Sequence, residues 1–331
     1  MRRRAIVQIP LLPLLLSSAA LLPTHAPAQT PSPAYPQRPL RILVGYSPGG
    51  AVDTIARALA QPLQAALGQP LIVDNKPGAG TNLAMRALID SPPDGHTLML
   101  VANAAAANPT LYQPAPFDVA RDLSPIALVG RVPVVIATAA QDELTSIAAL
   151  LAQSRAKPGV VTVGTPGNGS TPHLAVELFA HAAGITLTHV PYKGGAQAIT
   201  DTLAGHIQTV AVNALEVLPH VKSGKLRVLA VLSPQRVAIL PDVPTIAESG
   251  YPGFEASVWY GLVGPADLPP TVVARLHAEV QKALAGPELQ GRLAAAGGEA
   301  LPGTVARFSS LLASEQARYG KLIRAARIQP D

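Results

Sequence analysis

Residues 40–59 read LRILVGYSPGGAVDTIARAL, and this stretch decides the fold. It begins with a short apolar run, Leu40 to Val44, which predicts a buried strand. Apolar residues at helical spacing follow from Thr54 onward, so a helix is expected next. Between them, Gly49 and Gly50 permit a tight turn that leaves several backbone N–H groups around one point. The helix dipole adds partial positive charge there, so this corner suits a carboxylate or phosphate without any cationic side chain.

The chain as a whole alternates predicted strands and helices, which is typical of an α/β fold. Short apolar runs bounded by turn residues predict strands at 40–44, 71–74, 97–102, 126–129, 132–137, 160–164, 188–190, 208–212 and 226–232. The first three of these are expected to be buried parallel strands. Amphipathic stretches predict helices at 52–67, 82–91, 146–156, 172–183, 196–204, 271–285 and 304–326. Pro62 falls inside the first helix, so we expect a kink near residues 58–62 or a short break.

The first 28 residues have the three parts of a secretory signal peptide. Three arginines at positions 2–4 form the charged start, an apolar segment spans residues 11–22, and a small-x-small pattern predicts cleavage after Ala28. The apolar segment is short and proline precedes and interrupts it, which favours a cleaved leader over a membrane anchor. Residues 29–35 form a Pro-rich lead-in. The chain has no cysteine and cannot form disulfides, and the expected location is the bacterial periplasm.

The composition indicates a folded globular body: of 331 residues, 48% are hydrophobic and 14% are charged. The formal net charge of +5 falls to +2 without the three leader arginines, because 25 basic residues become 22 against 20 acidic ones. This small excess of positive charge does not indicate nucleic-acid binding. Aromatic residues make up only 4% of the chain, too few for a base-stacking platform.

Two further glycine-rich loops repeat the arrangement of the first, each between a predicted strand and the start of a predicted helix. We name the three loops the first cradle (Ser47–Gly50), the second cradle (Gly164–Thr171) and the third cradle (Pro191–Gly195). All three join the carboxyl end of a strand to the amino end of a helix, and open α/β sheets bind ligands at that edge. For any one of them, a plain tight turn is the alternative interpretation.

Two of the cradles resemble catalytic motifs but lack a required group. Residues 45–49 fit the G-x-S-x-G nucleophile elbow, in which the residue after the serine donates its backbone N–H to the oxyanion hole. That residue is Pro48, which has no N–H, so a serine hydrolase using Ser47 is disfavoured. The second cradle resembles a nucleotide-binding P-loop, but Ser170 occupies the position of the lysine. Nucleotide hydrolysis is therefore disfavoured as well.

The histidines do not predict a metal site. His173 and His181 lie eight residues apart on roughly one helix face, and no carboxylate completes a known ligand spacing. His173 stands in the first helical turn after the second cradle, where a hydrogen bond to a neighbouring loop is the favoured role. Asp53 stands in the first turn of its own helix. It can favour the dipole, anchor a loop or bind a ligand ammonium group, and the sequence leaves these roles open.

Nine blocks of sequence carry a resemblance to a known family. They are PGGAVD at 48–53, DNKPGAG at 74–80, PDGHTL at 93–98, NPTLY at 108–112, GNGS at 167–170, VPYKG at 190–194, GKLR at 224–227, LPDVPT at 240–245 and WYGL at 259–262. In this order they resemble the Bug family, extracytoplasmic solute receptors related to the tripartite tricarboxylate transporter. The resemblance runs from about Tyr35 to Arg327, nearly the whole mature chain.

The resemblance implies a periplasmic-binding-protein fold, in which a hinge joins two α/β lobes and the ligand binds in the cleft between them. Residues 36–130 and 227–331 would form lobe 1, and residues 131–226 would form lobe 2. Family members bind small carboxylates there, commonly through ordered waters, and the resemblance implies no catalytic residue, metal or cofactor. The expected ligand-binding residues are Tyr46, Ser47, Gly49, Gly50, Asp53, Asn103, Gly167, Asn168, Gly169, Ser170, His173, Tyr192, Lys193, Gly194 and Asn213.

The chain departs from the family pattern at positions that affect specificity. Family members often have Pro-Phe in place of Gly45-Tyr46, a histidine or larger polar residue near Ala105, and Phe-Asp before Asn213. Loss of a carboxylate and of bulky groups would leave a roomier and less charged pocket. We therefore hypothesise a ligand with one carboxylate and an apolar body, such as an aromatic or alicyclic acid. A di- or tricarboxylate is the rival.

The implied function is a receptor that captures a small carboxylate and delivers it unchanged to a membrane transporter. A bound anion that satisfies donors of both lobes favours the closed form, whose surface a membrane partner would then recognise. A signalling sensor in place of the transporter is an alternative that the sequence does not separate. An exported serine hydrolase using Ser47 is the rival from a different class of protein.

Overall fold

The computed structural model describes residues 35–330, so the predicted signal peptide (1–28) and residues 29–34 of the lead-in lie outside the described residues. The strands are β1 (Leu40–Val44), β2 (Leu71–Asn75), β3 (Thr97–Val101), β4 (Leu123–Ala139), β5 (Thr162–Thr165), β6 (Thr188–Pro191), β7 (Thr209–Asn213), β8 (Leu226–Val231), β9 (Ser257–Pro265) and β10 (Glu299–Ala300). The helices are α1 (Ala51–Leu67), η1 (Ala79–Thr81), α2 (Asn82–Ile89), α3 (Ala104–Leu111), α4 (Val119–Asp122), α5 (Ile147–Ala156), α6 (Thr171–Ala183), α7 (Gly195–Leu203), α8 (Ala214–Lys222), α9 (Pro270–Ala285), α10 (Pro287–Ala295) and α11 (Val305–Ala326).

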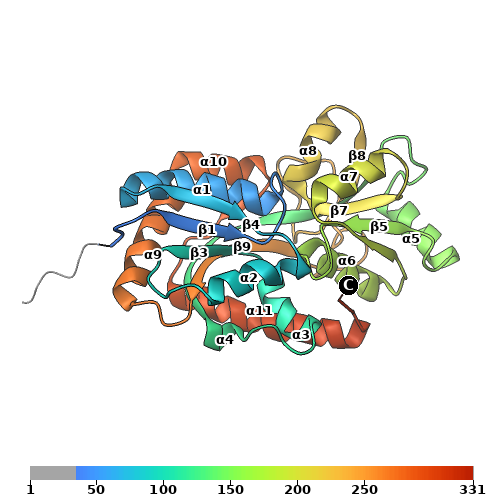
Figure 1. Cartoon of the computed structure of the whole chain (residues 1–331). Helices are drawn as coiled ribbons and strands as arrows, with labels where there is room; N and C mark the ends of the chain where they lie inside the picture. The colour runs from blue at the N-terminus through green and yellow to red at the C-terminus, as the bar shows by residue number, and fades with distance from the viewer. Residues whose placement is uncertain (1–34, 331) are drawn as a thin grey trace, which may run out of the picture. The chain divides into compact units, whose positions relative to one another are not determined.

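The strands of the described residues form one mixed sheet. Its order is β2-β1-β3-β9-β4-β7-β5-β6, and β10 and β8 also pair with β4 (Figure 1). β1 runs parallel to β2 and β3, as predicted for the first three strands, whereas β9 runs antiparallel to β3 and β4. β5 runs parallel to β6 and β7. A sheet of this kind with helices on its faces confirms the predicted α/β class.

One long strand connects the two parts of the sheet. The sequence predicts two strands, at 126–129 and 132–137, whereas β4 is a single strand of 17 residues. Its ladder with β9 ends at Pro133, and from Val134 onward it pairs with β7 and then β8. The pairing register with β9 shifts before Ala127 and again before Gly130, and the strand continues through both irregularities. Pro133 therefore sits where the partners change, and a proline has no N–H to donate to a ladder.

The predicted lobe boundaries fall within strands rather than between elements. The boundary at 130/131 lies inside β4, and the boundary at 226/227 lies at the start of β8. Both strands pair with each other over residues 135–139 and 226–231. The division into two lobes stays a prediction.

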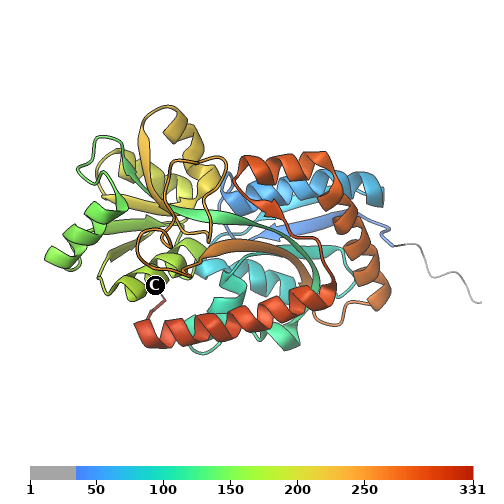
Figure 2. The same cartoon turned by 180° about the vertical axis from the view of Figure 1, so that it is seen from behind.

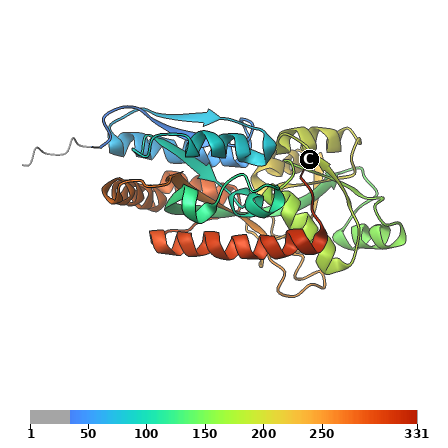
Figure 3. The same ribbon diagram turned by 60° about the horizontal axis from the view of Figure 1, so that its bottom comes forward.

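Separate cores lie on the two faces of the first part of the sheet. On β1, Ile42 belongs to one core and Leu43 to the other, because neighbouring side chains of a strand point to opposite faces. Helices α1, α9 and α10 contribute to the core of Ile42, and α2, α3 and α11 to the core of Leu43 (Figure 1, Figure 2). The long helix α11 runs along the second face (Figure 3).

Helix α1 begins directly after the first cradle, which follows the carboxyl end of β1. Its predicted apolar stripe is buried, and the stripe consists of Ile55, Leu59, Leu63 and Leu67. The helix continues through Pro62, so the predicted short break is wrong, while the kink stays a prediction. The helix ends at Gly68, which is left-handed with φ 67° and donates its N–H to the Gln64 carbonyl at 3.0 Å.

A substitution at the contact between β9 and α11 tests the packing of the core that contains Leu43 and Phe308. A Cβ at Gly261 would collide with the ring of Phe308. We expect Gly261→Ala to lower the free energy of unfolding by about 1–3 kcal/mol, the usual cost of overpacking a core. Urea unfolding followed by circular dichroism measures the change.

Gly291→Ala is the matched control, because Gly291 lies inside α10 and an added Cβ there meets no atom within 4 Å. Its stability should stay the same or rise by up to about 1 kcal/mol, since alanine is the better helix former. A Gly261→Ala protein as stable as the wild type would contradict the packing described.

Candidate functional site

Four helices begin around one cavity, each directly after the carboxyl end of a strand. The helices α1, α6, α7 and α8 follow β1, β5, β6 and β7, and the cavity between their first turns has a volume of about 210 Å³. The helix starts contribute Gly50, Ala51, Val52, Ser170, Thr171, Pro172, Gly194, Gly195, Ala196, Gln197, Asn213 and Glu216. The first N–H groups of a helix have no acceptor within that helix, and the dipole is positive there. This arrangement suits an anion.

The remaining wall of the cavity is mostly apolar. It consists of Tyr46, Ser47, Pro48, Ala102, Pro166 and Val258. Among the described residues that line the cavity, none is a lysine, an arginine or a histidine. An anion bound here would therefore be held by backbone and neutral side-chain donors, as the first cradle's sequence predicts.

Asp53 holds the first cradle from behind. Its carboxylate accepts the Gly49 N–H at 3.0 Å, the Arg57 Nε–H at 3.0 and 3.1 Å, and the Asn75 side-chain N–H at 3.0 Å. Burial opposes the charged form, but the hydrogen bonds from Arg57, Gly49 and Asn75 outweigh it, so the pKa of Asp53 lies below its usual value. Of the roles left open by the sequence, the structure shows loop anchoring. Asp53 does not line the cavity.

His173 holds the second cradle in the same way. Its Nδ1 accepts the Gly169 N–H at 3.1 Å, which fixes the neutral tautomer, and Ser170 caps the helix by accepting the His173 N–H at 3.4 Å. The His173 ring stacks on His189 with centroids 3.9 Å apart. Burial, and then the neighbouring His189, lower the pKa of His173 to about 3. The predicted hydrogen bond to a loop is therefore present, and the ring is neutral.

The third cradle contacts the first. The Ser47 hydroxyl donates to the Lys193 carbonyl at 3.1 Å, although the two residues lie 146 positions apart. The Tyr192 hydroxyl donates to Asp201 at 2.7 Å, and burial followed by this carboxylate raises the pKa of Tyr192 to about 12. The Lys193 N–H donates to Gln197 in the first turn of α7 at 3.2 Å. The loop is thus fixed against both the first cradle and its own helix.

The predicted ligand-binding residues divide into four groups by position. Those that line the cavity are Tyr46, Ser47, Gly50, Ser170, Gly194 and Asn213. An adjoining hollow of about 430 Å³ shares Tyr46 and is lined by the predicted residues Gly167, Asn168, Tyr192 and Lys193. Behind the lining lie Gly49, Asp53, Gly169 and His173, which shape the first and second cradles. Asn103 lies apart from these three groups.

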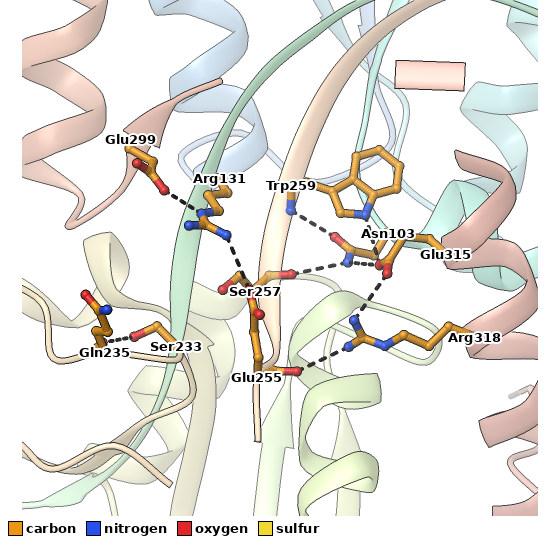
Figure 4. Close-up of polar contacts among 10 residues, drawn as sticks. All are labelled: Asn103, Arg131, Ser233, Gln235, Glu255, Ser257, Trp259, Glu299, Glu315 and Arg318. Carbon is orange, nitrogen blue, oxygen red and sulfur yellow. Dashed lines mark hydrogen bonds and ion pairs between the residues drawn. The ribbon is translucent and has the colours of Figure 1, made fainter. Parts of the chain in front are cut away.

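Asn103 belongs to a buried polar cluster between α3, β9 and α11 (Figure 4). Its side-chain N–H groups donate to Tyr319 at 2.7 Å and to Glu315 at 3.2 Å, and its Oδ1 accepts the Trp259 backbone N–H at 3.1 Å. Figure 4 also shows Arg318 beside Glu315, at 3.2 Å. Asn103 lines neither the cavity nor the adjoining hollow. The contacts give it a role in joining these three elements.

The structure adds cavity residues that the sequence analysis does not predict. Among the polar ones are Thr171, Gln197 and Glu216. Glu216 accepts a hydrogen bond from the Asn213 side chain at 3.0 Å. Burial raises the pKa of Glu216, although hydrogen bonds from Asn213 act in the opposite direction. A glutamate three residues after a helix-capping asparagine resembles a capping box, and that spacing is the one sequence signal that could have drawn attention to it.

Residues 35–330 contain neither a metal-binding cluster nor a membrane-spanning helix. In this range no three His, Cys, Asp or Glu side chains are grouped so that they could hold a metal ion. The same part of the chain contains no helix with the length and apolar character needed to span a bilayer.

The sequence matches a known family and several relatives. A model described as "Tripartite tricarboxylate transporter family receptor" matches residues 55–328. Protein BugT of Bordetella pertussis is 38% identical over 292 residues, which cover 88% of this chain and 90% of BugT.

Several solved structures share the fold at a sequence identity above 25%, and two of them are described with a bound ligand. A structure of an R. palustris protein with adipate has a TM-score of 0.85 and 31% identity, covering 90% of this chain and 100% of the other. MatC from Rhodopseudomonas palustris, solved with bound malate, has a TM-score of 0.81 and 27% identity, covering 87% and 100%.

The buried His173 predicts an acid-sensitive stability. The pKa of His173 is about 3 in the fold, against 6.5 for an ordinary histidine. The unfolded chain therefore binds the proton first, and stability is lost as the pH falls from 6.5 toward 3. In His173→Asn, which keeps an acceptor for the Gly169 N–H, this loss should be shallower by up to about 1.4 kcal/mol per pH unit.

Unfolding in urea over a pH series measures the two slopes. A comparison near pH 7.5, where the wild-type ring is neutral in both states, gives the packing cost of the substitution alone. Parallel pH profiles for the two proteins would show that the ring is not buried as a neutral group.

Proposed function

This chain belongs to the tripartite tricarboxylate transporter family of receptors, and we propose that it captures one small carboxylate in the cavity between its four helix starts. The chain is a solute-binding receptor of a transport family. The matches confirm the resemblance to the Bug family and the periplasmic-binding-protein-like α/β fold. The family and the structurally similar periplasmic binding protein BugD, with a TM-score of 0.84 and 30% identity, indicate the periplasm as its location. Export by the signal peptide at residues 1–28 is part of the proposal.

The observation that carries the proposal is the meeting of α1, α6, α7 and α8 around one cavity. Each helix start offers unpaired N–H donors and a positive dipole end to the same small volume. The related structures with adipate and with malate support a carboxylate as the chemical class of the ligand. The first cradle contributes through Ser47 and Gly50, the second through Ser170, and the third through Gly194.

The lining favours a ligand with one carboxylate and an apolar body. Val52, Ala102 and Val258 offer apolar contact surface, and the cavity wall already contains the carboxylate of Glu216. A second carboxylate on the ligand would meet that like charge in an enclosed space, where repulsion is poorly screened. An aromatic or alicyclic monocarboxylate therefore fits this wall better than a dicarboxylate does.

Binding would close the cleft and prepare the receptor for its partner. We assign the first cradle to lobe 1 and the other two cradles to lobe 2, so a carboxylate that accepts from both sides favours the closed arrangement. The contact between Ser47 and Lys193 crosses this boundary at 3.1 Å. Subunits of a membrane transporter would then recognise the closed surface and receive the ligand.

The geometry supports binding without chemical turnover. The Ser47 hydroxyl donates to a carbonyl, and no histidine is among the described residues that line the cavity to take a proton from it. Pro48, next to it, cannot donate an N–H to an oxyanion. These features support the receptor over an exported serine hydrolase.

A substitution that fills the cavity tests the location of the site. Ala196 lines the cavity in the first turn of α7, and its side chain is exposed. Ala196→Trp should weaken the binding of cyclohexanecarboxylate or benzoate by at least about 100-fold, because the indole occupies the space for the ligand. Isothermal titration calorimetry measures the affinity, and the melting temperature should stay near that of the wild type.

Ala313→Trp is the matched control, since Ala313 is exposed on α11 and lies outside the cavity. It should bind like the wild type. Undiminished binding by Ala196→Trp would place the ligand elsewhere, and no heat of binding from the wild type with any mono- or dicarboxylate would reject the proposed function.

A further inference from the structure

The carboxylate of Glu216 has no cationic partner in the described part of the chain. None of the ion pairs found among residues 35–330 includes it. Glu216 is half-buried, and two fully buried acidic residues differ from it: Asp53 pairs with Arg57 at 3.0 Å, and Glu279 pairs with Arg275 at 3.0 Å. Burying a charge without a partner is costly, so a protein keeps such a group where something else neutralises it or holds its proton.

Glu216 lies at the wall of the ligand cavity. One oxygen, Oε1, accepts from the Asn213 side chain at 3.0 Å. The other, Oε2, lies against Gly195, where a Cβ would collide with it. Both Gly195 and Glu216 line the cavity. The absence of a side chain at Gly195 therefore makes room for Oε2 at the cavity wall.

Neighbouring polar groups of the same wall also lack partners. The Oδ1 of Asn213 and the Oγ1 of Thr171 are buried without a hydrogen bond, in residues that are 5% and 2% exposed and that line the cavity. The hydroxyl of Tyr260 is likewise unpartnered. An amide oxygen can only accept, so the α8 side of the cavity needs a group that donates. A ligand carboxylate cannot do this.

Two buried tyrosines, Tyr46 and Tyr260, lie near Glu216. Burial raises the pKa of Tyr46 and of Tyr260, and the charge of Glu216 raises both further. No lysine or arginine lines the cavity among the described residues to reverse this sign. The α8 side is thus unfavourable to a second anion and favourable to a cation.

We propose that the ligand is an aminocarboxylate, with its carboxylate at the starts of α1, α6 and α7 and its protonated amine at Glu216. The ammonium group would donate to the Glu216 carboxylate and to the Asn213 Oδ1, which neutralises the charge of Glu216 and satisfies the unpartnered acceptor. This inference rests on the proposed function, because it assumes that the same cavity binds the carboxylate. It narrows the ligand class from monocarboxylates to those that carry a hydrogen-bond-donating cation.

Matched ligands on one ring test the proposal by calorimetry with the full mature protein. The set is aminocyclohexanecarboxylate, cyclohexanecarboxylate and cyclohexanedicarboxylate, together with the open-chain set aminopentanoate, pentanoate and glutarate. We expect the amine-bearing member of at least one set to bind about tenfold or more tightly than its plain analogue. The dicarboxylate of that set should bind more weakly than both.

Glu216→Gln removes the charge but keeps an oxygen that can accept from Asn213. In this variant the preference for the amine should fall to about twofold or less, and the dicarboxylate should gain affinity. Glu248→Gln is the matched control. Like Glu216, Glu248 accepts a hydrogen bond from the residue three positions before it, here from the Thr245 backbone N–H at 2.8 Å, but it lies outside the cavity. It should leave the preference unchanged.

Different results would contradict the aminocarboxylate assignment and the receptor function. Plain carboxylates that bind as tightly as their amine analogues in the wild type, or an amine preference that persists in folded Glu216→Gln, would overturn the aminocarboxylate assignment and leave the receptor function intact. Absence of binding by every acid would reject the proposed function itself. If Glu216→Gln does not fold, the ranking of the ligands by the wild-type protein decides the question alone.

Discussion

Backbone N–H groups without an acceptor are the constraint on which the rest of the site depends. β1, β5 and β6 each end near the cavity, and the helices that follow them begin there with their first donors unpaired. Asp53 and His173 do not contact this space, yet they fix the loops in front of it. The donors are therefore oriented before a ligand arrives, and little conformational freedom is lost on binding.

The same helix position has two different electrostatic roles in this protein. Asp53 and Glu216 are each the third residue of their helix, in α1 and α8. Asp53 is neutralised by Arg57 and serves the loop. Glu216 has no such partner and lines the cavity, so its charge is available to select the ligand. The position of the acidic residue in its helix therefore does not decide its role. What decides it is whether a basic residue, such as Arg57 for Asp53, stands on the next turn.

Local patterns in the sequence predict the elements whose causes are local. The bounds of β1 agree to the residue, and the predicted closing helix agrees with α11, which Thr304 caps, because apolar spacing and capping lie within a few residues. β4 and β9 are different. Gly130 and Arg131 interrupt the apolar run of β4, and pairing with β9 and β10, two strands absent from the prediction, carries the strand through them.

In the candidate site, too, features with local causes are predicted from the sequence and long-range contacts are not. Glycine loops before helices are visible in the sequence, and they lie at the cavity. Asn103 instead bonds to Glu315 and Tyr319, which are 212 and 216 positions away, and no local pattern shows such a contact. Glu216 has the spacing of a helix cap, but its exposure to the cavity depends on Gly195 in another helix. The ligand-binding roles of these residues stay predictions.

Pro133 has a mechanical consequence for the sheet. At this residue β4 exchanges β9 for β7, and the missing N–H leaves the ribbon with fewer cross-links than on either side. A β-strand bends most easily where the fewest hydrogen bonds resist it, so a bend in β4 would be easiest at Pro133. The parts of the sheet on the two sides of Pro133 would then move as rigid bodies, and the backbone conformation at this one residue would set the angle between them.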